Sequence, residues 1–141
     1  MKLIIGGAYQ GKLAYAKRTY GLQDGWIDGG KCAPEELRTC GGIDQFHILV
    51  RRMMEEGQWP EPFCLKADFT ELEHQAELFA AWLAAENPEI VIVTNELGCG
   101  VVPMDPAERF WREAVGRICT CLAARADEVV RVSCGLGMRL K

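Results

Sequence analysis

The chain has 141 residues, a net charge of −4 and an isoelectric point near 5.2. This length predicts a single domain, residues 1–141, that is large enough to bury a core. The acidic balance excludes a general nucleic-acid-binding protein, and the absence of any run of about 18 apolar residues excludes a membrane-spanning helix. The N-terminal sequence has no signal-peptide pattern, so we expect a cytoplasmic protein without nucleic-acid or membrane partners.

The cysteines and histidines are not arranged as metal ligands. The seven cysteines are an odd number without any Cys-x-x-Cys pair, and the two histidines, His47 and His74, stand apart. A structural zinc site requires ligand pairs at suitable spacing. We therefore predict reduced thiols in a reducing compartment, and no zinc site.

A glycine-rich segment lies between the first predicted strand, residues 3–5, and the first predicted helix, residues 12–20. Gly6, Gly11 and Lys12 have the spacing of a phosphate-binding loop. Glycines let consecutive backbone N–H groups turn toward phosphate oxygens, while the helix N-terminus and the lysine add positive charge. We predict that the loop binds GTP or ATP; the alternative is a simple glycine-rich turn. The predicted nucleotide-binding residues of the loop are Gly6, Gly7, Ala8, Tyr9, Gln10, Gly11, Lys12 and Leu13.

Two residues bear on phosphoryl transfer. The residue after the loop lysine is normally Ser or Thr, whose hydroxyl holds Mg²⁺; Leu13 has no hydroxyl, so we predict a weakened metal site. Residues 25–30 predict a very short strand that ends at Asp28, and acidic residues at such strand ends commonly hold Mg²⁺. We predict Asp28 as a metal ligand and, with Lys12, as a catalytic residue; the alternative is an Asp-Gly turn.

Three helices are predicted next, at residues 34–39, 43–56 and 70–86. The second has apolar residues at three-and-four spacing, and the third opens with a capping-box pattern at Thr70. His47 lies beside the apolar stripe of the second helix, four residues before an arginine. This spacing is compatible with a phosphate or nucleophile site, but we interpret His47 as a partly buried surface histidine.

The strongest strand signal is the β-branched run at residues 89–94, which is typical of a central parallel strand covered on both faces. The polar residues that follow, Asn95 and Glu96, should lie on the ligand-binding edge of the sheet. We therefore predict Asn95 as a nucleotide-binding residue and Glu96 as a metal ligand.

The C-terminal part predicts a long helix and one more strand. Asp105 and Pro106 suit the N-cap and first position of a helix at residues 106–126, and a strand at residues 129–134 precedes a short tail, residues 138–141. Strands alternate with helices along the chain. The predicted fold class is therefore α/β, a mostly parallel sheet flanked by helices.

A resemblance to a known family lies in the phosphate loop and in four segments nearer the C-terminus: residues 93–103, 116–117, 122–129 and 134–141. They resemble the adenosylcobinamide kinase / adenosylcobinamide-phosphate guanylyltransferases of cobalamin synthesis. The resemblance implies a P-loop NTPase core of the RecA-like branch. It also implies phosphorylation of the aminopropanol hydroxyl of adenosylcobinamide by a nucleoside triphosphate, followed by GMP transfer through a guanylylated histidine.

The chain departs from this family in one segment. The family places a strand and a helix that carries its nucleophilic histidine between the phosphate-loop helix and the acidic strand. Only residues 21–25 separate them here, and His47 follows Asp28, out of order for that role. We therefore expect the guanylyltransferase step to be lost, because a GMP–enzyme intermediate needs a nucleophile at that place.

We expect a shortened cobinamide-kinase-like protein. Lys12 would stabilise charge on the transferred phosphate, and Asp28 or Glu96 would hold Mg²⁺ or orient the attacking hydroxyl. The expected partners are a nucleoside triphosphate, an adenosylcobinamide-type alcohol and further copies of the chain in a homo-oligomer. The alternative, favoured by Leu13 and the missing segment, is a catalytically inactive nucleotide- or corrinoid-binding regulatory protein on the same scaffold.

Overall fold

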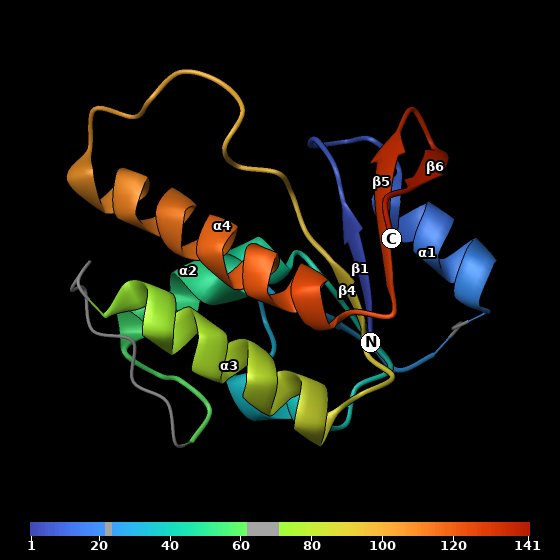
Figure 1. Cartoon of the computed structure of the whole chain (residues 1–141), viewed down its shortest axis with the longest axis horizontal. Helices are drawn as coiled ribbons and strands as arrows, with labels where there is room; N and C mark the ends of the chain where they lie inside the picture. The colour runs from blue at the N-terminus through green and yellow to red at the C-terminus, as the bar shows by residue number, and fades with distance from the viewer. Residues whose placement is uncertain (22–23, 62–70) are drawn as a thin grey trace.

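The computed structural model of the chain describes residues 1–21, 24–61 and 71–141 (Figure 1). Its elements, in chain order, are β1 (Lys2–Ile5), α1 (Lys12–Tyr20), β2 (Trp26–Asp28), η1 (Pro34–Arg38), β3 (Gly42–Asp44), α2 (Phe46–Glu56), α3 (Leu72–Glu86), β4 (Val91–Val93), α4 (Pro106–Arg125), β5 (Glu128–Ser133) and β6 (Leu136–Arg139). Among these residues, no helix combines the length and the apolar character needed to cross a membrane.

The strands form one sheet in the order β2-β3-β4-β1-β5-β6. Neighbouring strands from β2 to β5 are parallel, whereas β6 pairs antiparallel with β5. β4 lies between β1 and β3, so the carboxyl ends of these three strands meet at one edge of the sheet. The predicted α/β class with a mostly parallel sheet is confirmed, and the arrangement is that of a P-loop NTPase-like domain.

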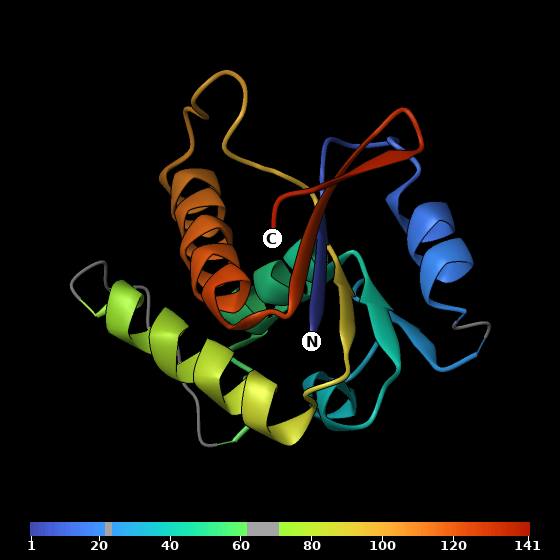
Figure 2. The same cartoon turned by 45° about the vertical axis from the view of Figure 1, so that its right-hand side comes forward.

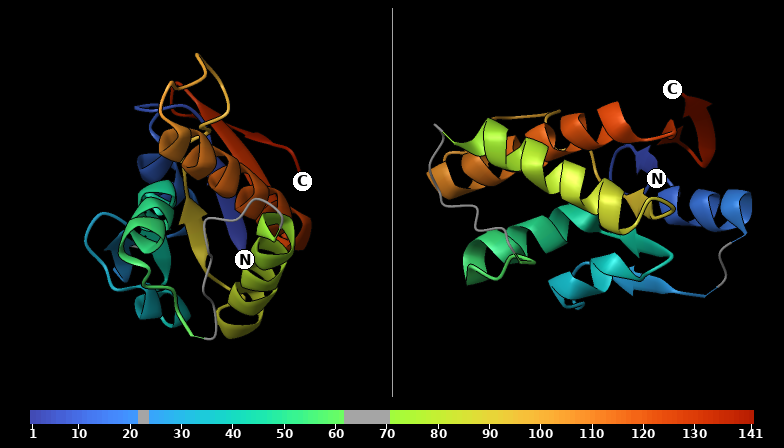
Figure 3. Two further views of the ribbon diagram at one scale, coloured as in Figure 1. Left: turned by 90° about the vertical axis from the view of Figure 1, so that its left-hand side faces the viewer. Right: turned by 60° about the horizontal axis from the view of Figure 1, so that its bottom comes forward.

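Helices cover both faces of the sheet. α1 lies on one face, and α2, α3 and α4 lie on the other (Figures 1 and 2). Figure 3 shows α3 running beside α4. The central residues of β1, Leu3 and Ile4, are both apolar because both faces of the strand are covered. Leu3 belongs to the core under α2, α3 and α4, and Ile4 packs with Ala16 of α1.

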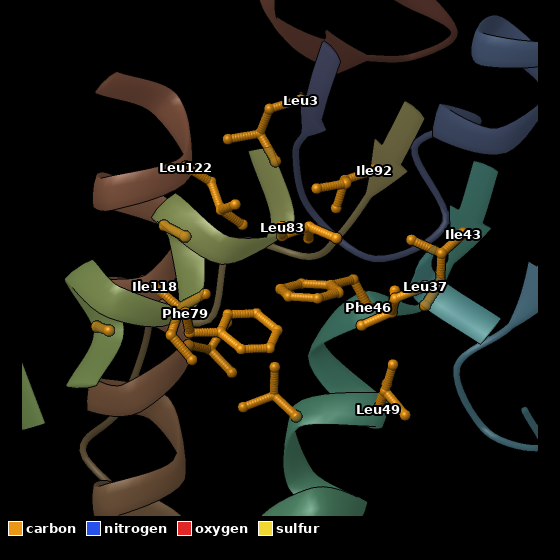
Figure 4. Close-up of a cluster of buried hydrophobic side chains, with 14 of the residues drawn as sticks. Leu3, Leu37, Ile43, Phe46, Leu49, Phe79, Leu83, Ile92, Ile118 and Leu122 are labelled. Carbon is orange, nitrogen blue, oxygen red and sulfur yellow. The ribbon is translucent and has the colours of Figure 1, made fainter. Parts of the chain in front are cut away.

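The larger core lies between the sheet and the three helices on its second face. Its labelled side chains in Figure 4 come from strands, from η1 and from all three helices: Leu3, Leu37, Ile43, Phe46, Leu49, Phe79, Leu83, Ile92, Ile118 and Leu122. The rings of Phe46 and Phe79 stack with their centroids 6.4 Å apart. Because Phe46 is the first residue of α2 and Phe79 belongs to α3, this contact joins the start of α2 to α3.

Several predicted elements are confirmed. α1 has the predicted bounds, residues 12–20. α4 begins where predicted, and Asp105 is its N-cap, with Oδ1 accepting a hydrogen bond from the backbone N–H of Ala107 at 3.0 Å. The capping-box prediction at Thr70 lies outside the described residues, and the described part of α3 begins at Leu72.

The prediction of a helix from residue 43 is wrong. Gly42–Asp44 forms the strand β3, and α2 begins only at Phe46, after Gln45 in a left-handed conformation with φ 55°. The apolar side chain of Ile43 fits the helical spacing as well as a buried strand, so the pattern alone did not separate the two. Pairing with β2 and β4 decides in favour of the strand.

The prediction that only a short tail, residues 138–141, follows the last strand is also wrong. Leu136–Arg139 forms β6, which makes a hairpin with β5. The two turn residues, Cys134 and Gly135, have φ 51° and φ 77°. Positive φ at both positions is the requirement of a type I′ two-residue hairpin turn, where Asn-Gly is the common signal. Cysteine at the first position hid this hairpin from sequence analysis.

Candidate nucleotide-binding site

The glycine-rich loop connects β1 to α1 at the carboxyl edge of the sheet. Gly6 has φ 148°, and a Cβ atom at this position would lie 2.3 Å from the carbonyl oxygen of Val132 on β5. Gly11 has φ 79° and is the N-cap of α1. Tyr9, between them, has φ 60° and a fully exposed side chain. Glycine is therefore needed at both ends of the loop, as the predicted phosphate-binding motif requires.

The backbone N–H groups of this loop are available to a ligand. Within the described part of the chain, no protein group accepts a hydrogen bond from the backbone N–H of residues 7–12. Lys12 is buried, and its Nζ donates to the carbonyl oxygen of Gly7 at 2.6 Å. Burial lowers the pKa of Lys12, although the nearby carboxylates of Asp44 and Glu96 act in the opposite direction. The lysine thus points into the loop and not into bulk water.

The C-terminal hairpin holds the loop in shape. Oε1 of Gln10 accepts a hydrogen bond from the backbone N–H of Cys134 at 2.8 Å, and the Gln10 carbonyl oxygen accepts one from Gly135 at 2.9 Å. Arg18 of α1 adds a contact to the Gly135 carbonyl oxygen at 3.4 Å. Figure 2 shows the β5–β6 hairpin beside the loop. Two segments far apart in the sequence therefore form one structural unit.

A cavity of about 400 Å³ lies against the loop. It is bounded by the loop, the start of α1, the ends of β3 and β4, and α2. Its lining residues are Ala8, Tyr9, Gln10, Gly11, Lys12, Leu13, Ala14, Asp44, Gln45, His47, Val93, Thr94 and Asn95. Most of the predicted loop residues and Asn95 are therefore brought together, whereas Gly6 and Gly7 do not line this cavity.

Asp44 places a carboxylate in this cavity and was not predicted as a site residue. It ends β3, and its pKa is raised because the carboxyl group is buried and because Asp28 lies nearby; Lys12 acts in the opposite direction. Sequence analysis placed Asp44 inside a helix. Recognition of β3 as a strand would have put this acidic residue on the ligand-binding edge.

Asp28 lies at the end of β2, beside the cavity but outside its lining. Its Oδ1 accepts hydrogen bonds from the backbone N–H of Gly30 at 2.8 Å and from Nε2 of Gln45 at 3.2 Å. Lys31 is 3.8 Å from the other oxygen. This is the geometry of the Asp-Gly turn that we considered as the alternative, and the catalytic and metal roles of Asp28 remain predictions.

Glu96 lies on the other side of the loop. Its carboxylate pairs with Arg131 of β5 at 3.0 Å and lines a second, open cavity of about 1040 Å³ between the loop, β5 and β6. The structure therefore does not bring Asp28 and Glu96 into one cavity. Across residues 1–21, 24–61 and 71–141, no group of three or more His, Cys, Asp or Glu side chains could hold a metal ion.

His47 is buried in the wall of the first cavity, so the prediction of a partly buried surface histidine is wrong. Its ring contacts the backbone and the side chain of Asn95, and the indole N–H of Trp111 donates to its carbonyl oxygen at 2.9 Å. Burial, with a smaller effect from Lys12, lowers the pKa of His47 to about 4. The imidazole is therefore neutral at pH 7.

Comparison with known proteins identifies the family. Residues 33–140 match the family described as cobinamide kinase / cobinamide phosphate guanyltransferase, CobU. The chain belongs to this family. This confirms the resemblance drawn from the C-terminal motifs; the matched region begins after the phosphate loop.

Two curated relatives match a shorter part of the chain. Over 53 residues the chain is 45% identical to the bifunctional adenosylcobalamin biosynthesis protein CobU of Salmonella typhimurium (strain LT2). Over the same length it is 43% identical to the protein of that name from Escherichia coli (strain K12). The matched segment is 38% of this chain and 29% of each relative, so it spans less than a third of either relative's length.

Proposed function

We propose that the cavity beside the loop binds the triphosphate of GTP or ATP. The observation that carries this proposal is the set of backbone N–H groups at residues 7–12 that have no described protein acceptor, with the Lys12 ammonium among them. Free N–H groups and a cation at a helix N-terminus are an arrangement that binds phosphate. Asn95, at the end of β4, would add a contact from a side chain.

Family membership supports a role for this site in adenosylcobalamin biosynthesis. In the proposed reaction the nucleotide phosphorylates the hydroxyl of a cobinamide-type alcohol. Lys12 stabilises the charge that develops on the transferred phosphate, because catalysis of phosphoryl transfer depends mainly on positioning and charge stabilisation. The second open cavity shares Ala8 and Gln10 with the first, so it offers the acceptor an approach to the loop.

Mg²⁺, bound with the nucleotide, would neutralise charge on the phosphate oxygens. Asp44 is the residue that would hold it, since it presents a carboxylate to the cavity. Mg²⁺ is commonly bound by one or two carboxylates, phosphate oxygens and waters, and the donor set fits that pattern. Leu13 lines the same cavity and has no side-chain oxygen, which supports the predicted weakening of the metal site. Asp28 and Glu96 are the further candidates.

We also propose that the guanylyltransferase step is absent. His47 is the histidine that lines the cavity, and both of its ring nitrogens contact Asn95. A ring held in this way has no nitrogen free to attack a phosphate. A second candidate function is a catalytically inactive nucleotide- or corrinoid-binding regulatory protein, which Leu13 favours because it removes one metal ligand.

Thermal-shift titration separates these possibilities. GTP or ATP with Mg²⁺ at a hundred times its Kd should stabilise the protein by about 2.7 kcal/mol. Lys12→Ala should abolish the shift, whereas Lys31→Ala should retain it, because the Lys31 side chain is 85% exposed and lies outside the cavity. Turnover of adenosylcobinamide selects the kinase, and a shift without turnover selects the regulatory protein. Absence of a shift with either nucleotide rejects both.

A further inference from the structure

His47 has two polar contacts with a single residue, Asn95. The backbone N–H of Asn95 lies 3.4 Å from His47 Nδ1, and its side-chain amide lies 3.0 Å from His47 Nε2. A backbone N–H can only donate, so Nδ1 must accept and carries no proton. A neutral imidazole has one proton, which is therefore on Nε2.

The proton on Nε2 determines how the amide of Asn95 must be oriented. A ring N–H cannot pair with an NH₂ group, because both are donors, so the carbonyl oxygen Oδ1 must face the ring. The oxygen and nitrogen of an Asn amide are assigned from such networks. The NH₂ group of Asn95 then occupies the position on the side of the amide away from the ring. No described residue is a hydrogen-bond partner at that position, and Asn95 lines the cavity.

We propose that His47 is a positioning residue that turns the NH₂ group of Asn95 toward the cavity as a donor to a phosphate oxygen. This inference rests on the proposed nucleotide binding and extends it. With the opposite orientation, the partly negative carbonyl oxygen would face the anion and repel it. His47 therefore acts through Asn95 and does not need to touch the nucleotide.

The imidazole is held firmly enough for this role. It is 5% exposed, and its ring stacks on that of Trp111 with centroids 6.4 Å apart. The Trp111 N–H bond to the His47 carbonyl oxygen ties α4 to the start of α2 at the same point. Asn95 lies two residues after the last residue of β4, and His47 lies in the first turn of α2, so two elements from different parts of the chain hold the two partners.

The tautomer can be measured without any ligand. A long-range ¹H–¹⁵N correlation spectrum at pH 7 should contain two imidazole rings, because the chain has two histidines. The variant His74→Gln removes the exposed ring and assigns the remaining signals to His47. We expect a single proton on Nε2. A proton on Nδ1, or on both nitrogens, would overturn the proposal.

A double-mutant cycle on nucleotide affinity tests the coupling. Asn95→Ala should weaken binding of ATP or GTP about tenfold to a hundredfold, as expected for the loss of a hydrogen bond to a charged group. His47→Ala should weaken binding in the parent protein but have no further effect in the Asn95→Ala background. Independent, additive losses would show that His47 does not act through Asn95.

Two further variants keep this test informative. His47→Gln retains a side-chain N–H donor, so it should recover part of the affinity even if His47→Ala folds poorly; no recovery in a folded His47→Gln protein counts against the proposal. His74→Ala should leave affinity unchanged. If the unmodified protein binds neither nucleotide, the proposed function fails, and the tautomer measurement alone then decides the orientation of Asn95.

Discussion

Lys12 and Asp44 carry opposite charges in one cavity, and burial disfavours the charged form of both. The pKa of Lys12 is lowered and that of Asp44 is raised, with desolvation as the first cause in each case. Each charge partly offsets the desolvation of the other. A bound triphosphate would attract Lys12 and repel Asp44 unless a cation lay between the phosphate and the carboxylate. For this reason we assign Lys12 to the phosphate and Asp44 to the metal ion.

This assignment predicts different results for two conservative substitutions. Loss of an outer-shell partner of a metal ion typically weakens metal binding about tenfold to a hundredfold. Asp44→Asn should weaken the Mg²⁺-dependent part of nucleotide binding by at least that factor. Affinity for the nucleotide without Mg²⁺ should be unchanged or higher, because a negative charge has been removed. The measurement is a titration of nucleotide at several Mg²⁺ concentrations.

Asp28→Asn is the matched control for this experiment. Asp28 carries the same charge nearby, but it does not line the cavity, and its carboxylate already accepts hydrogen bonds from Gly30 and Gln45. We expect its Mg²⁺ dependence to match that of the unmodified protein. The reverse pattern, loss in Asp28→Asn and retention in Asp44→Asn, would restore the prediction made from the sequence.

At the scale of elements, the β5–β6 hairpin and the phosphate loop depend on one another. Gln10 connects them through its side chain and its carbonyl oxygen. Gly6 and Val132 are also so close that no side chain fits between them. The shape of the loop therefore depends on β5 as well as on its own glycines. A substitution in the hairpin should consequently change the affinity for phosphate.

The side-chain contact can be removed separately. Gln10→Ala loses the hydrogen bond from Cys134 and the long, exposed one of 3.5 Å that Nε2 donates to the Ala8 carbonyl oxygen. The loss should lower the free energy of unfolding by about 1 kcal/mol, mostly from the shorter bond. The thermal midpoint should fall by roughly 4 °C, and nucleotide affinity should decrease as well. Gln58→Ala, at an exposed position far along the chain, should change neither quantity. Unchanged affinity in a destabilised Gln10→Ala protein would show that the hairpin does not shape the binding site.

At the scale of the whole molecule, the buried His47 links folding to pH. Its pKa is about 4 in the folded protein, whereas the reference pKa of a histidine, which applies to the unfolded chain, is 6.5. Between these values the unfolded chain binds a proton that the folded chain does not, so the free energy of unfolding falls as the pH decreases from 6.5 to 4. The raised pKa of Asp44 acts with the opposite sign, because the folded protein is then the better proton acceptor.

Comparison with a variant isolates the contribution of His47. The free energy of unfolding should be measured by denaturant at pH 7 and at pH 4. Between these two values it should fall by about 3 kcal/mol more in the unmodified protein than in His47→Gln. His74→Gln should retain the full pH dependence, since His74 is exposed. Equal pH dependence in His47→Gln and the unmodified protein would mean that the ring is not desolvated in solution.

The sequence by itself determined the features that depend on local spacing. Three local patterns each identify an element to within a few residues. The spacing of Gly6, Gly11 and Lys12 identifies the start of α1, the N-cap Asp105 the start of α4, and the apolar run the strand β4. The alternation of these elements was enough to predict the α/β class. The family motifs in the C-terminal third are continuous in sequence, so they too could be recognised without a structure.

Only the tertiary structure decided which polar side chains share a cavity. Asp44 joins Lys12 because a three-residue strand pairs with its neighbours, and three residues are too few to show a period of their own. His47 meets Asn95 across 48 positions of sequence, since α2 packs against the end of β4. Contacts between distant residues are set by strand order and helix packing, and neither is encoded in the spacing of any single segment.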